Sequence, residues 1–203
     1  SSSMPCDGST MASSYYSRRF PNVPVFHLCF PVRYMDEETV QMGAEDIKAC
    51  IKFIEQKTGA KWNWDAYFTQ IKRFNKETEY ELQKWEVNKS AYPQLLGPCY
   101  ELFRKWNYEM DGGADPRTIK TFEKVNDLLM KAYANKEEPW PGKMKYRAIV
   151  WSCPAHYYAN FSNWAANCWG INVLVEMESL NFTKPLETED KEEAMRDLAR
   201  LYE

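Results

Sequence analysis

The sequence lacks any apolar run long enough to cross a membrane, and it does not open with a basic segment followed by an apolar one. We therefore expect neither a membrane-spanning helix nor a secretory leader, and we expect a cytoplasmic protein with no membrane partner. It also lacks a basic stripe, because its 26 Lys and Arg are interspersed with 29 Asp and Glu, giving a net charge of -3. Nucleic acid binding requires such a stripe, so no nucleic acid partner is expected.

Paired cysteines are absent as well. The six cysteines are spread singly with no CxxC pair, at positions Cys6, Cys29, Cys50, Cys99, Cys153 and Cys168. This spacing excludes a zinc knuckle and a ferredoxin-type motif, and it is typical of a reduced protein. Any metal centre must therefore gather its ligands from distant parts of the sequence or from outside it.

What is present is enough apolar sequence for a real core, since 44% of the 203 residues are hydrophobic. The pattern predicts an α/β protein with parts of two α/β domains joined by a helical block. We place the end of the first α/β domain in residues 1–35, the helical segment in 36–142 and the start of the second α/β domain in 143–203. The boundaries follow changes between continuous apolar runs and three-and-four spacing.

The helical block contains four expected helices. In the first, apolar residues from Val40 to Ile54 recur at spacings of three and four, and Gly59 is suited to end it. Apolar residues from Tyr67 to Trp85 predict a second helix, and those from Cys99 to Trp106 a third. Asp115 and Pro116 are suited to start a fourth, with Ile119, Phe122, Val125, Leu129 and Ala132 on its buried side.

The two flanking regions alternate between strand and helix patterns. We expect a short helix over 11–19 and a buried strand over 23–32, and then, in the last region, strands over 146–153 and 171–178 around a helix that ends at Gly170. A charged helix closes the chain from Asp190 to Glu203. Because a two-stranded parallel sheet cannot stand alone, we expect the sequence to be the central part of a longer chain.

Cys6 lies in a small polar loop before the first expected helix. Backbone donors at a helix N-terminus favour a thiolate, so this cysteine is suited to hold a metal centre. The alternative is an inert cysteine, which is what most single cysteines are.

The order of several motifs resembles one known family. A CDG loop at Cys6, the strand PVFHLCFP, the helix FIEQKTG, the segment KRFNKET and the strand RAIVWSCP follow one another along the chain. In this order they resemble a subunit of the 2-hydroxyacyl-CoA dehydratase and benzoyl-CoA reductase family, over nearly the whole sequence. The individual motifs are loose, and their order carries the resemblance.

The resemblance implies parts of two Rossmann-like parallel-sheet domains joined by a helical block. It also implies an enzyme subunit with a [4Fe-4S] cluster held by three widely separated cysteines. Cys6 matches the middle ligand, and the other two would lie outside this sequence, so these residues alone would be inactive. The partners implied are a homologous second subunit, an ATP-dependent iron-sulfur activator that donates one electron, and an acyl-CoA substrate. The implied reaction is radical dehydration of a 2-hydroxyacyl-CoA to an enoyl-CoA in an anaerobe; the alternatives are a benzoyl-CoA reductase subunit or a non-catalytic helical scaffold subunit.

Three further residues are candidates for the site, because ligands of α/β domains lie at the carboxyl ends of strands. Arg33 is suited to pair with a CoA phosphate or a substrate carboxylate, although a surface arginine is the alternative. His156 and Tyr157 are suited to donate hydrogen bonds or a proton near the thioester, although a loop histidine is more often only solvated.

Other polar residues are interpreted as structural. His27 is expected to be a hydrogen-bonded core histidine, and cysteines within helices or strands are expected to pack as small hydrophobes. The Glu and Lys runs around Lys76–Glu86 and Glu187–Glu193 indicate solvated helix faces.

Overall fold

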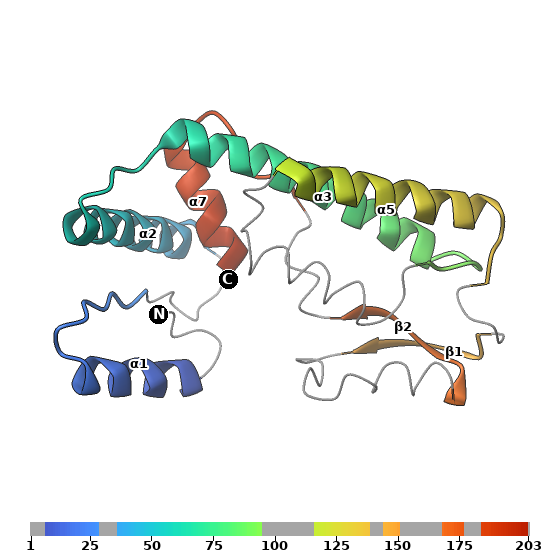
Figure 1. Cartoon of the computed structure of the whole chain (residues 1–203), viewed down its shortest axis with the longest axis horizontal. Helices are drawn as coiled ribbons and strands as arrows, with labels where there is room; N and C mark the ends of the chain where they lie inside the picture. Colours follow the sequence, from blue (N-terminus) through green and yellow to red (C-terminus); the bar gives the residue numbers. More distant parts are fainter. Residues whose placement is uncertain are drawn as a thin grey trace. The chain divides into compact units, whose positions relative to one another are not determined.

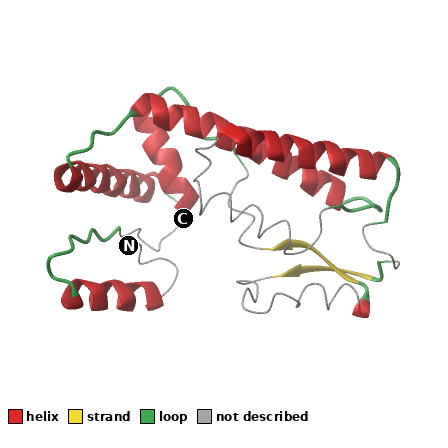
Figure 2. Ribbon diagram, in the orientation of Figure 1, coloured by secondary structure: helices red, strands yellow, loops and turns green. Residues whose placement is uncertain are grey.

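The computed structural model describes residues 7–28, 36–94, 116–138, 144–150, 168–176 and 184–202. Their fold is mixed α/β, mostly helical, with a small parallel sheet of two strands (Figures 1 and 2). The described elements are α1 (Asp7–Arg19), α2 (Glu37–Thr58), α3 (Trp64–Asn88), α5 (Pro116–Ala134), β1 (Tyr146–Val150), β2 (Ile171–Glu176) and α7 (Lys191–Tyr202).

The chain divides into two compact units. One consists of Ser1–Ile71 together with Leu186–Glu203, and the other consists of Lys72–Pro185. The boundary therefore falls within α3, and the C-terminal helix α7 belongs to the same unit as α1 and α2. The division into 1–35, 36–142 and 143–203 stays a prediction.

Helix α2 has the bounds that its sequence signals predict. The side chain of Asp36 accepts a hydrogen bond from the backbone N–H of Thr39 at 2.8 Å, which caps the N-terminus. Gly59 ends the helix in the left-handed conformation with φ 76°, and its N–H donates to the carbonyl of Glu55. Val40 and Ala44 are buried as the spacing predicts, whereas Ile54 is 48% exposed.

The long helices α3 and α5 lie side by side and run in the same direction. Asn126 of α5 donates to Gln83 of α3 at 2.8 Å. Beyond the ends of both helices, Gln94 donates to the carbonyl of Glu137 at 2.7 Å. Phe122 and Leu129 are buried on α5, as predicted, and α5 begins at Pro116 as its sequence indicates. The helix predicted over 99–106 lies outside the described residues.

The sheet consists of β1 and β2 in parallel, as the predicted strand-helix-strand order requires. Tyr146 is paired with Ile171, and the register shifts between Ala148 and Ile149, which indicates a bulge. Gly170 lies directly before β2 with φ 65°, after a helical Cys168 and Trp169. Glycine is suited to this turn because a side chain strains a backbone with positive φ.

The strand predicted over 23–32 is not regular in its described part. Residues 24–27 form no strand, and only Leu28 takes part in a bridge. Pro24 has no N–H to donate to a ladder, which explains why a strand does not start there.

The core of the unit that contains the N-terminus is the packing of α7 against α2. Val40 and Ala44 of α2 and Met195 and Ala199 of α7 are buried together, with 0–3% of each residue exposed. Small alanine side chains let the two helix backbones approach closely, while Met195 fills the space between them. Burial of the Met195 side chain contributes about 1.5–3 kcal/mol.

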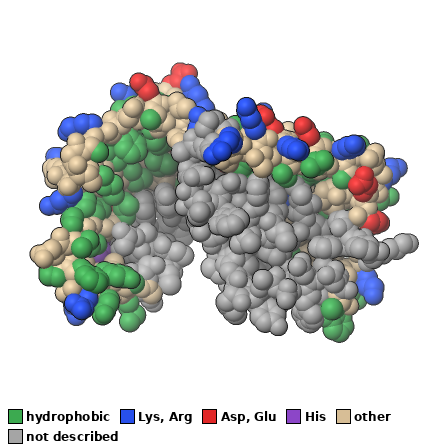
Figure 3. Space-filling model, in the orientation of Figure 1, with side chains coloured by type: hydrophobic (Ala, Val, Ile, Leu, Met, Phe, Trp, Pro, Cys, Tyr) green, Lys and Arg blue, Asp and Glu red, His purple; other side chains and the backbone are tan. Residues whose placement is uncertain are grey.

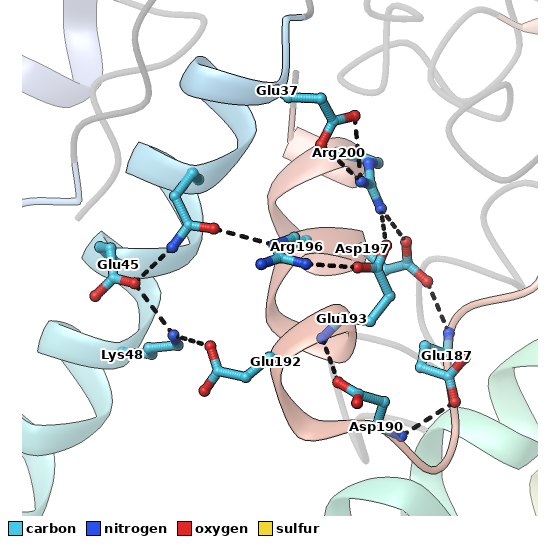
Figure 4. A network of polar contacts seen from close by, with 11 residues as sticks. Glu37, Glu45, Lys48, Glu187, Asp190, Glu192, Glu193, Arg196, Asp197 and Arg200 are labelled. Atoms are coloured by element: carbon cyan, nitrogen blue, oxygen red, sulfur yellow. Dashed lines mark hydrogen bonds and ion pairs between the residues drawn. The ribbon is translucent and has the colours of Figure 1, made fainter.

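Charged side chains surround this apolar contact (Figure 4). Arg200 pairs with Glu193 at 2.6 Å and Asp197 at 2.7 Å on its own helix, and with Glu37 of α2 at 3.3 Å. Lys48 of α2 pairs with Glu192 of α7. Exposed ion pairs contribute little each, so they set the orientation of α7 while the apolar residues supply most of the stability.

Candidate functional site

The four residues assigned to the site from sequence, Cys6, Arg33, His156 and Tyr157, lie outside the described residues. Their roles stay predictions. The structure does describe α1, which follows Cys6 in the sequence, and β1, which precedes His156 and Tyr157. These two elements bear on the chemistry that the site can perform.

Helix α1 begins at the residue directly after Cys6. It starts four positions earlier than the helix predicted over 11–19. The first N–H groups of a helix have no partner within it, and the helix dipole favours negative charge there. A thiolate adjoining this helix start is consistent with the chemistry proposed for Cys6 from the sequence.

A serine and a histidine meet beside α1. Ser13 is 6% exposed, and its hydroxyl oxygen lies 3.4 Å from Nδ1 of His27. The Ser13 hydroxyl donates to the carbonyl of Thr10 at 3.2 Å, so its proton is not directed at the imidazole. This pair therefore anchors the segment after α1 and does not form an activated nucleophile. His27 itself is exposed, which corrects the expectation of a core histidine.

Exposed apolar side chains gather on α1 and on the residues after it, as Figure 3 shows. The large ones are Met11, Tyr15 and Tyr16 on the helix and Phe20 and Val23 after it, with exposed fractions of 47–73%. Tyr16 and Phe20 stack at 6.1 Å between ring centroids. Little of α1 is buried in this chain apart from Ser13.

The sheet supplies the edge at which the predicted residues of the second α/β region would lie. Strands β1 and β2 are parallel, so their carboxyl ends at Val150 and Glu176 lie at the same edge. His156 and Tyr157 follow β1 in the sequence. Ligands of α/β proteins bind beyond the carboxyl ends of the strands, so this order is consistent with a role for both residues in ligand binding.

The described cysteines do not form a metal site. Cys50 is half-buried on α2 and Cys168 is exposed before β2, and these two thiols belong to different compact units. Among the described residues, no three or more His, Cys, Asp or Glu side chains come together as a metal-binding group. A [4Fe-4S] cluster needs several thiolates, so the described residues do not fit one.

A buried charged stripe on α3 was missed by the sequence analysis. The run around Lys76–Glu86 was interpreted as a solvated face, but Glu77, Glu81 and Lys84 are only 2–7% exposed. They share one helix face with Asn88, at spacings of four, three and four. This spacing is the feature of the sequence that could have indicated burial. Polar residues that repeat at the helical period lie on one face of a helix, and such a face can be buried when its charged side chains pair.

Glu81 is the centre of this stripe. Its Oε1 accepts hydrogen bonds from Nζ of Lys84 and Nε1 of Trp85, each at 3.1 Å. Its Oε2 is buried and has no hydrogen-bond partner among the described residues. Removing one partner of a buried ion pair is strongly destabilising, so the packing of Glu81 depends on Lys84.

The same stripe reaches the sheet. The side-chain amide of Asn88 donates to the carbonyl of Leu174 in β2 at 3.3 Å and accepts from the N–H of Gln94 at 2.9 Å. Asn172 of β2 is 1% exposed, and within the part of the chain that the structure describes neither its amide nitrogen nor its oxygen has a hydrogen-bond partner. The stripe therefore holds α3 against the strand and positions the loop that follows the helix.

The described helices include none that is both long enough and apolar enough to cross a membrane.

Comparison with protein families matches residues 1–203 to the family described as 2-hydroxyglutaryl-CoA dehydratase, D-component. None of the curated proteins compared with the chain matches it. The family match covers the segments CDG, PVFHLCFP and RAIVWSCP, whose order carried the resemblance, and it confirms that resemblance.

Proposed function

Because this chain belongs to the 2-hydroxyglutaryl-CoA dehydratase D-component family, we propose that it is a subunit of an enzyme that removes water from a 2-hydroxyacyl-CoA. The observation that carries the proposal is the family match over residues 1–203. The order of the motifs around Cys6 and in the two flanking α/β regions supports it.

The proposed reaction breaks the bond between C2 and its hydroxyl group and one C–H bond at C3, and it forms a C2–C3 double bond. The products are an enoyl-CoA and water, so the net reaction is redox-neutral. A proton must reach the departing hydroxyl and another must leave C3. Both transfers require acid–base groups beside the thioester.

We assign these transfers to His156 and Tyr157. A histidine changes protonation near neutral pH, and a tyrosine hydroxyl donates a hydrogen bond to an oxygen that gains negative charge. Arg33 is proposed to bind a phosphate of CoA or a substrate carboxylate, because its planar guanidinium pairs with either in two parallel hydrogen bonds.

Cys6 is proposed to be one ligand of a [4Fe-4S] cluster. Its thiolate is the ligand type that iron-sulfur clusters use, and the start of α1 directly after it favours the deprotonated form. The described residues supply no further ligand set. When bound, the cluster would supply one-electron reduction of the substrate.

The proposed partners are a homologous second subunit, which would form a heterodimer with this chain, and an ATP-dependent iron-sulfur activator. We place the complex in the cytoplasm of an anaerobe. Two Rossmann-like domains, one on each side of the helical block, are the proposed architecture of the intact enzyme.

The proposal is tested on the anaerobically prepared complex of the chain in its natural full-length context with its second subunit and activator. Cys6→Ser should lower iron and acid-labile sulfide in this subunit and abolish activator-dependent formation of enoyl-CoA, because a hydroxyl is a poor iron-sulfur ligand. Cys50→Ser and Cys168→Ser are the matched controls. They should keep iron and turnover, with a loss of stability of at most about 1–2 kcal/mol.

Full iron and turnover in Cys6→Ser, with loss of both in Cys50→Ser, would place the cluster on another cysteine. Reduction of an aromatic ring in place of dehydration would favour the aryl-CoA reductase. An iron-loaded complex whose turnover is independent of this subunit would favour a scaffold.

A further inference from the structure

A cavity of about 410 Å³ lies where the parallel helices α3 and α5 both end. It is lined by Ser90, Ala91 and Tyr92 after α3 and by Tyr133, Ala134 and Lys136 at the end of α5. The hydrogen bond from Gln94 to the carbonyl of Glu137 holds the two chain segments together at this point. Ligand pockets in proteins typically measure roughly 300–1,000 Å³, so this cavity, which is open to solvent on one side, has room for a small molecule.

Lys136 occupies a strained backbone position at the cavity. Its φ is 56°, and among the described residues it is the one non-glycine with a positive φ. Its N–H donates to the carbonyl of Tyr133, and the N–H of Glu137 donates to that of Ala132, so the position ends α5 as Gly59 ends α2. A lysine is strained in this conformation, whereas a glycine would adopt it freely. Strain of this kind tends to persist where the side chain has a function.

The last carbonyls of both helices are bound without the side chain of Lys136, so capping does not require a lysine side chain at this position. The guanidinium of Arg147 donates to the carbonyls of Lys89 and Ser90 after α3. The last carbonyls of α5 accept from backbone N–H groups. The ion pairs of the described residues do not involve Lys136.

The remaining lining residues add donors and aromatic surface. Oγ of Ser90 accepts from the N–H of Tyr92 at 3.0 Å, which leaves the Ser90 hydroxyl proton free to donate. Tyr92 and Tyr133 contribute rings and hydroxyl groups. The charge on the lining side chains is positive, which favours an anionic group, and the rings favour a flat apolar body.

We propose that this cavity binds a small aromatic anion, a flat ring that carries one carboxylate or phosphate group. The anionic group pairs with Lys136 and the Ser90 hydroxyl, and the ring packs between Tyr92 and Tyr133. This site is separate from Cys6, Arg33, His156 and Tyr157, and it goes beyond the proposed dehydratase function.

The test is isothermal titration calorimetry of the full chain with four probes. Phenylacetate and phenyl phosphate carry both a ring and an anion, inorganic phosphate carries the anion alone, and benzyl alcohol carries the ring alone. The two aromatic anions should bind one per chain, at least about tenfold more tightly than either single-feature probe, since a charge-assisted hydrogen bond contributes on the order of 1.4 kcal/mol or more. The ratio between phenylacetate and phenyl phosphate identifies which anionic group the site prefers.

Lys136→Gly separates a binding role from a structural one. The variant relieves the positive φ, so its melting temperature should stay level or rise while affinity for the better aromatic anion falls at least about tenfold. Lys131→Ala is the matched control, because it removes the same charge from the last turn of α5 at a residue that does not line the cavity.

Three results would each overturn the proposal. The affinity could be unchanged in Lys136→Gly, or Lys131→Ala could lose as much affinity as Lys136→Gly. Inorganic phosphate could also bind as tightly as phenyl phosphate. This binding assay does not depend on dehydratase turnover, so the two proposals fail independently.

Discussion

At the scale of single residues, backbone conformation decides where helices end. Gly59 and Gly170 both have positive φ, and each lies at the end of a helical segment. Lys136 takes the same kind of position at the end of α5. The glycines relieve strain, whereas the lysine introduces it at a cavity.

Gly59→Ala should lower the free energy of unfolding by about 1 kcal/mol. An added Cβ meets nothing within 4 Å, so the loss comes from the φ of 76° and not from a clash. Chemical denaturation measures the change, with Lys61→Ala at an exposed neighbouring position as the control that should have little effect. A loss of several kcal/mol would mean that the residue packs against something more than solvent.

Two lysines, Lys84 on α3 and Lys89 directly after it, form the same type of ion pair in different surroundings. Lys84 pairs with Glu81 with side chains only 4% and 3% exposed, whereas Lys89 pairs with Glu86 with side chains 69% and 71% exposed. Lys84→Ala should lower the free energy of unfolding by about 3–5 kcal/mol, because it leaves the Glu81 carboxylate buried without its cation. Lys89→Ala should change it by less than about 1 kcal/mol. Equal effects in denaturant titrations would show that Glu81 does not depend on Lys84.

At the scale of elements, α7 and the turn that precedes it contain carboxylates that favour their charged form. Hydrogen bonds from Arg200 and Arg196 lower the pKa of Glu193 below its usual value of 4.5. Backbone N–H groups of Glu189, Asp190 and Thr188 lower the pKa of Glu187 in the same way. The Arg200 guanidinium in turn has its pKa raised, chiefly by its hydrogen bond to Glu193.

These shifts predict how stability depends on pH. A carboxyl group with a lower pKa in the folded protein binds fewer protons than in the unfolded chain, so it stabilises the fold above pH 4.5, and this stability is lost as the pH falls through the folded pKa. Glu193→Gln should therefore make the melting temperature less dependent on pH below about 4.5. Glu189→Gln is the matched control at an exposed position and should leave the pH dependence unchanged. An identical acid profile for the wild type and Glu193→Gln would contradict the role of this network.

At the scale of the whole molecule, the C-terminal segment completes the unit that contains the N-terminus. Residues 186–203 belong with 1–71, and α7 supplies Met195 and Ala199 to the core that α2 shares. The packing of α2 thus depends on residues that are remote in the sequence.

Deletion of residues 186–203 should speed amide hydrogen exchange in α2 by at least about tenfold, because burial of Met195 alone contributes more than about 1.4 kcal/mol. Helix α5 belongs to the other compact unit and serves as the internal control. Exchange in α5 should change little. If α2 keeps its protection after the deletion, the contact with α7 does not stabilise it.

The sequence by itself determined the features that depend on neighbouring residues. The three-and-four spacing from Val40, the end of α2 at Gly59 and the start of α5 at Pro116 were all predicted, because helix periodicity and capping act within a few residues. The order of motifs was also sufficient to indicate the family, which the match over residues 1–203 confirms. The roles of the predicted site residues stay predictions.

Tertiary structure alone decided which surfaces are buried. Composition made the charged stretch around Glu81 and Lys84 look solvated, yet both residues are buried. The charged helix α7 was predicted, but its contact with α2 was not, because burial depends on a partner surface that lies far away in the sequence. The cavity beside Lys136 likewise forms only because α3 and α5 end at the same place, and no local pattern records that meeting.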